Sequence, residues 1–205
     1  MKMNLWINSI LDSQEKYELQ LSKAINNIDV KNFDKDETIR DLLEISYTGL
    51  EDSYKIGKEC LKKEYDIVDN STPNVRLIKN LIYNKDGKIV DDRVLEHVKK
   101  FIDKFNKPED LANISLIRSA KQELKEKLFK IQNTEAVCVF NNTLTFIAEK
   151  HGYTGYRIIS IGECTSHTVN CNDEDGKEYE IKDLDHKPPF HPNCKCTIEL
   201  IKEGE

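Results

Sequence analysis

The chain has 205 residues and a mass of 23.8 kDa, with 38% hydrophobic and 33% charged residues. This length can bury a sizeable core, and the composition is polar without being extreme enough to force disorder. The net charge of −6, the lack of any run of about 18 apolar residues and the lack of a basic run exclude a membrane span and argue against an electrostatic nucleic-acid binder.

The first residues contain no apolar stretch of the kind found in secretory signals. We therefore expect the chain in a reducing cytosol. There, clustered cysteines more often bind metal ions or act as catalytic thiols than form disulfides.

The first two thirds of the sequence predict helices, because apolar residues recur every three to four positions. We expect Lys107–Asp110 to open the fifth helix, Asn133 or Thr134 to cap the sixth, and Gly152 to end it. Lys85–Lys88 is expected to form a turn. The apolar stripes span Ile7–Ile28, Ile39–Leu61, Leu77–Leu81, Val94–Phe105, Leu111–Ile131 and Val137–Ile147.

After Gly155 the pattern becomes typical of short strands, with a hairpin turn at Asp175–Gly176. The predicted fold class is α+β. An elongated helical N-terminal region, residues 1–132, precedes a small β-rich, zinc-knuckle-like C-terminal module, residues 133–205. The predicted strands span residues 156–161, 179–181 and 197–201.

Acidic residues and cysteines are concentrated together near the C-terminus. From Ile161 to Glu205 there are five basic and eleven acidic residues, so the whole net charge lies there, with four of the six cysteines. Two short Cys/His clusters about twenty residues apart, each beside a turn, are typical of a tetrahedral Zn²⁺ site with half of its ligands from each cluster. The candidates are Cys164, His167, Cys171, His191, Cys194 and Cys196.

Six candidates compete for four positions. Cys171, His191 and Cys194 are the firmest choices, and Cys164 or His167 is expected to be the fourth ligand. Cys196 follows Cys194 by two residues. If this piece is extended, the two side chains point in opposite directions and only one of them binds the metal. Ordinary buried thiols are the alternative, which the acidity of the segment disfavours.

Other residues of these types are interpreted as structural. Cys60 and Cys138 fall on helical apolar stripes and are expected to be core thiols. The acidic run Asp173–Asp175 is expected to be a solvated turn. The remaining histidines are expected to be solvated or to cap helices: His97, His151 and His186.

Four segments together resemble the phage Mu F-like head morphogenesis family, which comprises minor capsid proteins of tailed phages. The resemblance covers about seventy residues, and its closing motif, His-Pro-Asn-Cys-Lys-Cys, is its most specific part. Two positions depart from the family: Asn133 replaces the usual Arg, and Thr168 stands where the first knuckle cysteine is expected. His167 or Cys164 would replace that ligand. The segments are Asn133–Glu135, Tyr156–Ile159, Cys171–Lys177 and Pro188–Cys196.

The resemblance implies a structural minor capsid protein, not an enzyme, associated with the portal or the inner head during assembly. The implied partners are the portal protein and the major capsid or scaffold proteins. The implied location is the virion head, and the host cytoplasm during assembly. Contact with packaged DNA is not indicated by the charge. Structural Zn²⁺ is the implied cofactor.

Two alternative functions use the same Cys/His clusters. A metal-dependent enzyme would need an open metal position and a general base, and the His-x-Glu with Pro-Cys-x-x-Cys pattern of deaminases is absent. A zinc-ribbon nucleic-acid-binding protein would need a basic surface, whereas this segment is acidic.

Overall fold

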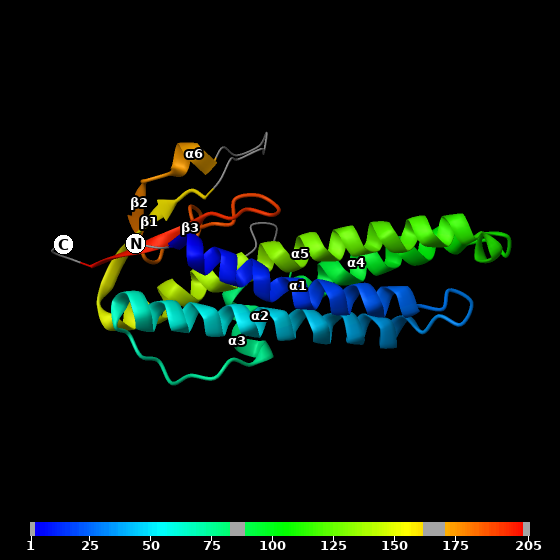
Figure 1. Cartoon of the computed structure of the whole chain (residues 1–205), viewed down its shortest axis with the longest axis horizontal. Helices are drawn as coiled ribbons and strands as arrows, with labels where there is room; N and C mark the ends of the chain where they lie inside the picture. Colours follow the sequence, from blue (N-terminus) through cyan, green and yellow to red (C-terminus); the bar gives the residue numbers. More distant parts are fainter. Residues whose placement is uncertain (1–2, 83–88, 162–170, 203–205) are drawn as a thin grey trace.

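The computed structural model describes residues 3–82, 89–161 and 171–202, and the predicted turn at Lys85–Lys88 lies outside them. Four long helices lie side by side along the long axis and form an elongated bundle (Figure 1). A short helix packs against two of them, and three strands follow near the C-terminus. The predicted α+β class is therefore confirmed. The long helices are α1 (Met3–Asn27), α2 (Lys35–Tyr65), α4 (Val90–Ile102) and α5 (Ile114–Ala148); the short one is α3 (Val75–Leu81).

Short polar side chains set the starts of three helices. Asp34 caps α2 by accepting a hydrogen bond from the backbone of Glu37 at 2.9 Å, and Asn74 caps α3 in the same way. The predicted start of the fifth helix at Lys107–Asp110 is wrong. This segment forms a local turn in which the Asp110 carboxylate accepts from the Lys107 backbone, and Asn113 caps α5 instead. Short 3-10 turns span Asp103–Phe105, Asp110–Ala112 and Glu149–His151.

Helix α5 continues without a break through the positions expected to cap a sixth helix, so that prediction is also wrong. The Thr134 hydroxyl donates to the Lys130 carbonyl one turn earlier at 2.7 Å, and the Asn133 amide reaches Glu18 on α1 at 2.6 Å. The Thr134 hydroxyl is therefore used within the helix, and residues 114–148 contain no glycine or proline that would end it. The predicted boundary between residues 132 and 133 therefore falls inside a helix.

The three predicted strands are present and form one antiparallel sheet in the order β2-β1-β3. Tyr156 in the central strand pairs with Tyr179 on one side and Leu200 on the other. Gly152 and Gly176 adopt positive φ angles of 82° and 77°, at the end of the α5 extension and at the turn before β2. The strands are β1 (Tyr153–Ile159), β2 (Glu178–Glu180) and β3 (Thr197–Lys202), and a one-turn helix α6 (Cys171–Glu174) lies between β1 and β2.

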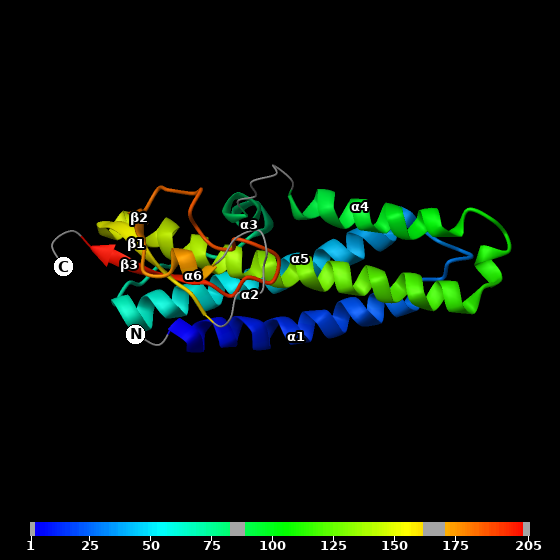
Figure 2. The same ribbon diagram turned by 90° about the horizontal axis from the view of Figure 1, so that it is seen from above.

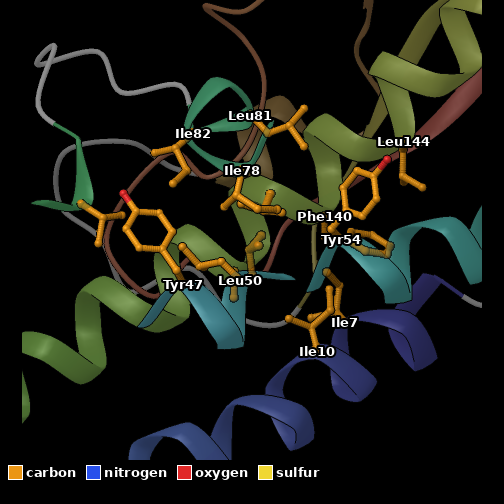
Figure 3. Packing of buried hydrophobic residues seen from close by; sticks show 14 of the residues in the cluster. Ile7, Ile10, Tyr47, Leu50, Tyr54, Ile78, Leu81, Ile82, Phe140 and Leu144 are labelled. Atoms are coloured by element: carbon orange, nitrogen blue, oxygen red, sulfur yellow. The ribbon is translucent and has the colours of Figure 1, made fainter. Parts of the chain in front are cut away.

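The sheet and the bundle share one hydrophobic core. Tyr156 and Ile198 belong to the same cluster of buried side chains as Leu50, Tyr54 and Phe140. Figure 3 shows the last three in the packed interior. Burial of apolar surface therefore holds the sheet on the helices. The three buried cysteines near the C-terminus form a separate cluster with Phe190.

The middle of the bundle contains a buried polar contact between α1, α2 and α5. The Gln132 amide donates to Gln14 at 2.7 Å and to the Ser46 carbonyl at 3.2 Å, and Gln14 donates to the Gly49 carbonyl at 3.2 Å. Because buried amides are costly when unpaired, this network specifies the register of the three helices. No helix in the described ranges is sufficiently long and apolar to span a membrane.

Candidate metal centre

The second half of α5 supports the segment that carries the closing Cys/His cluster. The Asn193 backbone N–H donates to the Thr134 hydroxyl at 3.0 Å. Two turns further on, the Asn141 side chain donates to the Cys196 carbonyl at 3.2 Å and accepts from the Thr197 hydroxyl at 2.8 Å. The segment before β3 lies over α5 in both views (Figures 1 and 2).

The end of β1 positions the other half of the cluster. Ile158 exchanges backbone hydrogen bonds with Lys177 and Gly176, both at 2.9 Å, and the Ser160 N–H donates to Asp175 at 2.7 Å. These contacts hold α6, and Cys171 is its first residue.

Three predicted ligands meet in space. The Cys171 Sγ lies 3.0 Å from the His191 Nε2 and 3.8 Å from the Cys194 Sγ, and all three atoms lie within 4.8 Å of one another. Both cysteines are buried and His191 is half-buried. Among the described residues, this group has the composition and spacing to hold a metal ion.

The orientation of His191 suits metal binding. Its Nδ1 lies 3.0 Å from the Pro192 carbonyl oxygen. A carbonyl only accepts hydrogen bonds, so in the neutral ring the proton sits on Nδ1 and the Nε2 lone pair faces the thiols.

The distances fit a tetrahedral ion after a small adjustment. With bonds of about 2.3 Å to sulfur and about 2.1 Å to nitrogen, two sulfurs lie about 3.8 Å apart, and sulfur and nitrogen about 3.6 Å apart. The observed separation of the two sulfurs, 3.8 Å, matches, whereas the imidazole must withdraw by about half an ångström. Thiolates and an imidazole together form a soft donor set.

Cys196 lies in the same buried cluster as Cys171 and Cys194, not on the opposite side as an extended segment would place it. β3 begins only at Thr197, so Cys194 and Cys196 precede the regular strand and the alternation of side chains expected for an extended segment does not apply. Cys196 is not in the group whose donor atoms all lie within 4.8 Å of one another, and its thiol lies 3.8 Å from the Ser160 hydroxyl. The two candidates expected for the fourth position, Cys164 and His167, lie outside the described residues.

A hydrogen bond between the thiols of Cys194 and Cys196 shifts their pKa values in opposite directions. This bond lowers the pKa of Cys196. The same bond, together with burial, raises the pKa of Cys194. The cluster therefore favours one thiolate, the form in which cysteine binds metal ions.

The residues interpreted as structural have structural surroundings. Cys60 and Cys138 are buried in the helical region, as predicted, and burial raises the pKa of Cys60 to about 12. Exposed His186 bonds to Asp183 at 3.0 Å. In the acidic run, Glu174 accepts hydrogen bonds from Lys177 and Tyr179, at 2.8 and 2.7 Å.

Asn141 was not among the predicted site residues, although it connects α5 to the cysteine segment. The available signal was a pair of asparagines, Asn141 and Asn142, inside an otherwise apolar helical run. Buried amides at such positions need partners from elsewhere in the chain.

No family model, curated protein or solved structure matches the chain. Fold and site together define an α+β protein in which a long helical bundle carries a small antiparallel sheet and a Cys/His cluster that can hold a metal ion.

Proposed function

We propose that this chain is a structural minor capsid protein, active in head morphogenesis of a tailed phage or prophage and without enzymatic activity. The observation that carries the proposal is the contact between two segments of the resemblance that lie far apart in the sequence. The closing motif, residues 191–196, hydrogen-bonds through Asn193 to Thr134 of the Asn-Thr-Glu segment. If the segments of the resemblance form one structural module, they should contact one another. This hydrogen bond is such a contact.

The proposed partners are the portal protein and the major capsid or scaffold proteins, and the proposed location is the phage head, after assembly in the host cytoplasm. The acidic charge of the C-terminal segment supports contact with protein surfaces, because a negative surface repels DNA. The elongated bundle carries the sheet near one of its ends (Figure 1). The two ends of the molecule therefore offer separate surfaces for contacts with partners.

We further propose that the cluster holds a structural Zn²⁺, bound by Cys171, His191, Cys194 and one more ligand. Zinc prefers this mixture of thiolate and imidazole in closed tetrahedral sites. The ion would join α6 to the segment before β3, two pieces with few apolar side chains of their own.

Metal analysis of purified variants tests the metal proposal. We expect Cys194→Ser to lose most of the bound zinc, while Cys138→Ser, which removes a buried thiol on α5, retains it. Equal loss in both variants would contradict the ligand assignment. Spectroscopy of the cobalt-substituted protein should show a four-ligand tetrahedral site, and an open position would favour an enzyme.

Deletion of the coding sequence from the phage or prophage tests the capsid proposal. We expect fewer DNA-filled heads in electron micrographs, and the protein itself in purified wild-type particles by mass spectrometry. Particles that lack the protein and form normally without its gene would refute this function, whatever the metal analysis shows.

A further inference from the structure

A cavity of about 540 Å³ lies between α4, the second half of α5 and the segment from Leu184 to Pro192. This volume is in the range of small-molecule sites. His191 lines it, so the cavity adjoins the candidate metal centre.

The cavity is basic in a chain that is acidic overall. Four basic and two acidic side chains line it: Arg93, Lys127, Lys130 and Lys187, with Glu96 and Glu135. Both acids already have cationic partners, since Glu135 pairs with Arg93, and Glu96 with Lys100 at 2.7 Å. Among the described residues, the three lysines of the cavity have no carboxylate partner.

Lys187 is the most unusual of these groups, because it is only 7% exposed. Its ammonium donates to the Thr145 hydroxyl at 2.8 Å and lies 5.5 Å from the centre of the Tyr156 ring. No carboxylate of the described residues forms an ion pair with this ammonium. The charges of Asp183 and Glu149 attract it from further away, but burial outweighs them and lowers the pKa of Lys187 to about 8. An anion bound in the cavity would add a negative charge beside this side chain.

Much of the remaining wall is apolar, with Ile131, Leu184 and Phe190 beside three prolines. Polar groups also line it, from His97, Thr134, His191 and Asn142. The Asn142 Nδ2 donates to the Leu81 carbonyl, while its buried Oδ1 has no hydrogen-bond partner among the described residues. A ligand with a hydrocarbon portion fits this surface.

We propose that the cavity binds a small organic anion, whose carboxylate or phosphate group pairs with Lys187 and whose hydrocarbon portion lies against Ile131 and Phe190. This inference does not depend on the proposed capsid function, because it rests on the cavity alone.

Calorimetric titration of the full chain tests the proposal with three probes: phenyl phosphate, benzoate and neutral benzyl alcohol. We expect at least one anion to bind, and the stronger anion identifies the preferred head group. Benzyl alcohol should bind far more weakly than that anion. Lys187→Met should weaken anion binding about thirtyfold or more, as loss of one partner of a buried charge pair does. Lys62→Gln, an exposed lysine on α2, should leave it unchanged.

A stability measurement separates a binding role from a structural one. If Lys187 serves a ligand, Lys187→Met removes an uncompensated buried charge and should not lower the midpoint of thermal unfolding. If that variant does not fold, Lys130→Glu, at an exposed position of the wall, should weaken anion binding instead. Absence of anion binding at millimolar concentration, equal binding of benzyl alcohol, or unchanged affinity in the folded lysine variants would overturn the proposal.

Discussion

Glu135 is a carboxyl group enclosed in the protein beside one guanidinium. Its side chain is almost fully buried and pairs with Arg93. Burial raises its pKa to about 7, because the attraction of Arg93 offsets only part of the cost of removing a carboxylate from water. At neutral pH the folded protein therefore contains both protonation states of this group.

Protonation of Glu135 should make the free energy of unfolding depend on pH. Its pKa rises from 4.5 in the unfolded chain to about 7 in the folded protein, so the folded state holds an extra proton between these values. The contribution of Glu135 to the free energy of unfolding is thus fully present below pH 4.5 and declines as the pH rises towards 7.

Urea titrations of wild type and Glu135→Gln across this pH window measure that contribution. Shared effects, including protonation of the metal ligands, cancel in the difference between the two proteins. We expect the advantage of wild type to shrink as the pH rises. A constant difference would mean that Glu135 stays ionised throughout.

Helix α2 packs closely against α1 and α5 at Gly49. A Cβ at this position would lie 2.4 Å from the Gln132 amide nitrogen and 3.0 Å from the Gln14 amide oxygen. Gly49→Ala should therefore lower the free energy of unfolding by about 1–3 kcal/mol, although alanine is the better helix former. Thr48→Ala, at the exposed neighbouring position, should change it little. Chemical denaturation compares them, and a Gly49→Ala variant as stable as wild type would show that the amides can move apart.

At the scale of elements, α5 is the helix that contacts both the bundle and the C-terminal module. Its first half packs in the bundle, and its second half holds both the sheet and the cysteine segment. Because one continuous helix contacts both the bundle and the C-terminal module, no flexible linker joins these two regions. Movement of the C-terminal module relative to the bundle would therefore require the loss of buried contacts.

Asn141 connects α5 to the cysteine segment through three partners of its side chain: the carbonyls of Pro188 and Cys196 and the hydroxyl of Thr197. Asn141→Ala should lower the free energy of unfolding by about 1–3 kcal/mol, since the Cys196 carbonyl and the Thr197 hydroxyl lose their partner. It should also speed the loss of metal to a chelator. Gln122→Ala, exposed on the same helix, is the control. Unchanged stability and metal release would show that the apolar contacts alone hold the segment.

At the scale of the whole molecule, two kinds of interaction stabilise different parts. The sheet belongs to the common hydrophobic core, whereas the buried cysteines form a small cluster apart from it. Metal loss should therefore loosen the cysteine segments without unfolding the sheet or the bundle.

Chelation tests this separation. After metal removal, we expect rapid reaction of Cys171, Cys194 and Cys196 with a thiol reagent, while Cys60 and Cys138 stay protected and the far-ultraviolet circular dichroism changes little. Hydrogen exchange should rise in residues 190–196 and remain slow in β1. Cooperative loss of all helical structure on chelation would contradict the expectation that the sheet and the bundle stay folded without the metal.

The amino-acid sequence by itself determined the helical and β regions, three of the proposed ligands and the core thiols. These depend on local periodicity and on residue type, which a sequence displays directly. It failed at Asn133 and Thr134, which lie inside a helix: the Thr134 hydroxyl bonds back to the previous turn, and the Asn133 amide nitrogen has a tertiary partner on α1.

Only the tertiary structure decided that Cys196 shares a cluster with Cys194, since the segment before β3 is not a regular strand. It alone placed Asn141 against the cysteine segment and enclosed Lys187 in a basic cavity. Each of these features joins residues far apart in the chain, and their energies depend on burial, which no local pattern records. The cysteines and the acidic charge thus share a segment of sequence, but the basic cavity beside them emerges only from the fold.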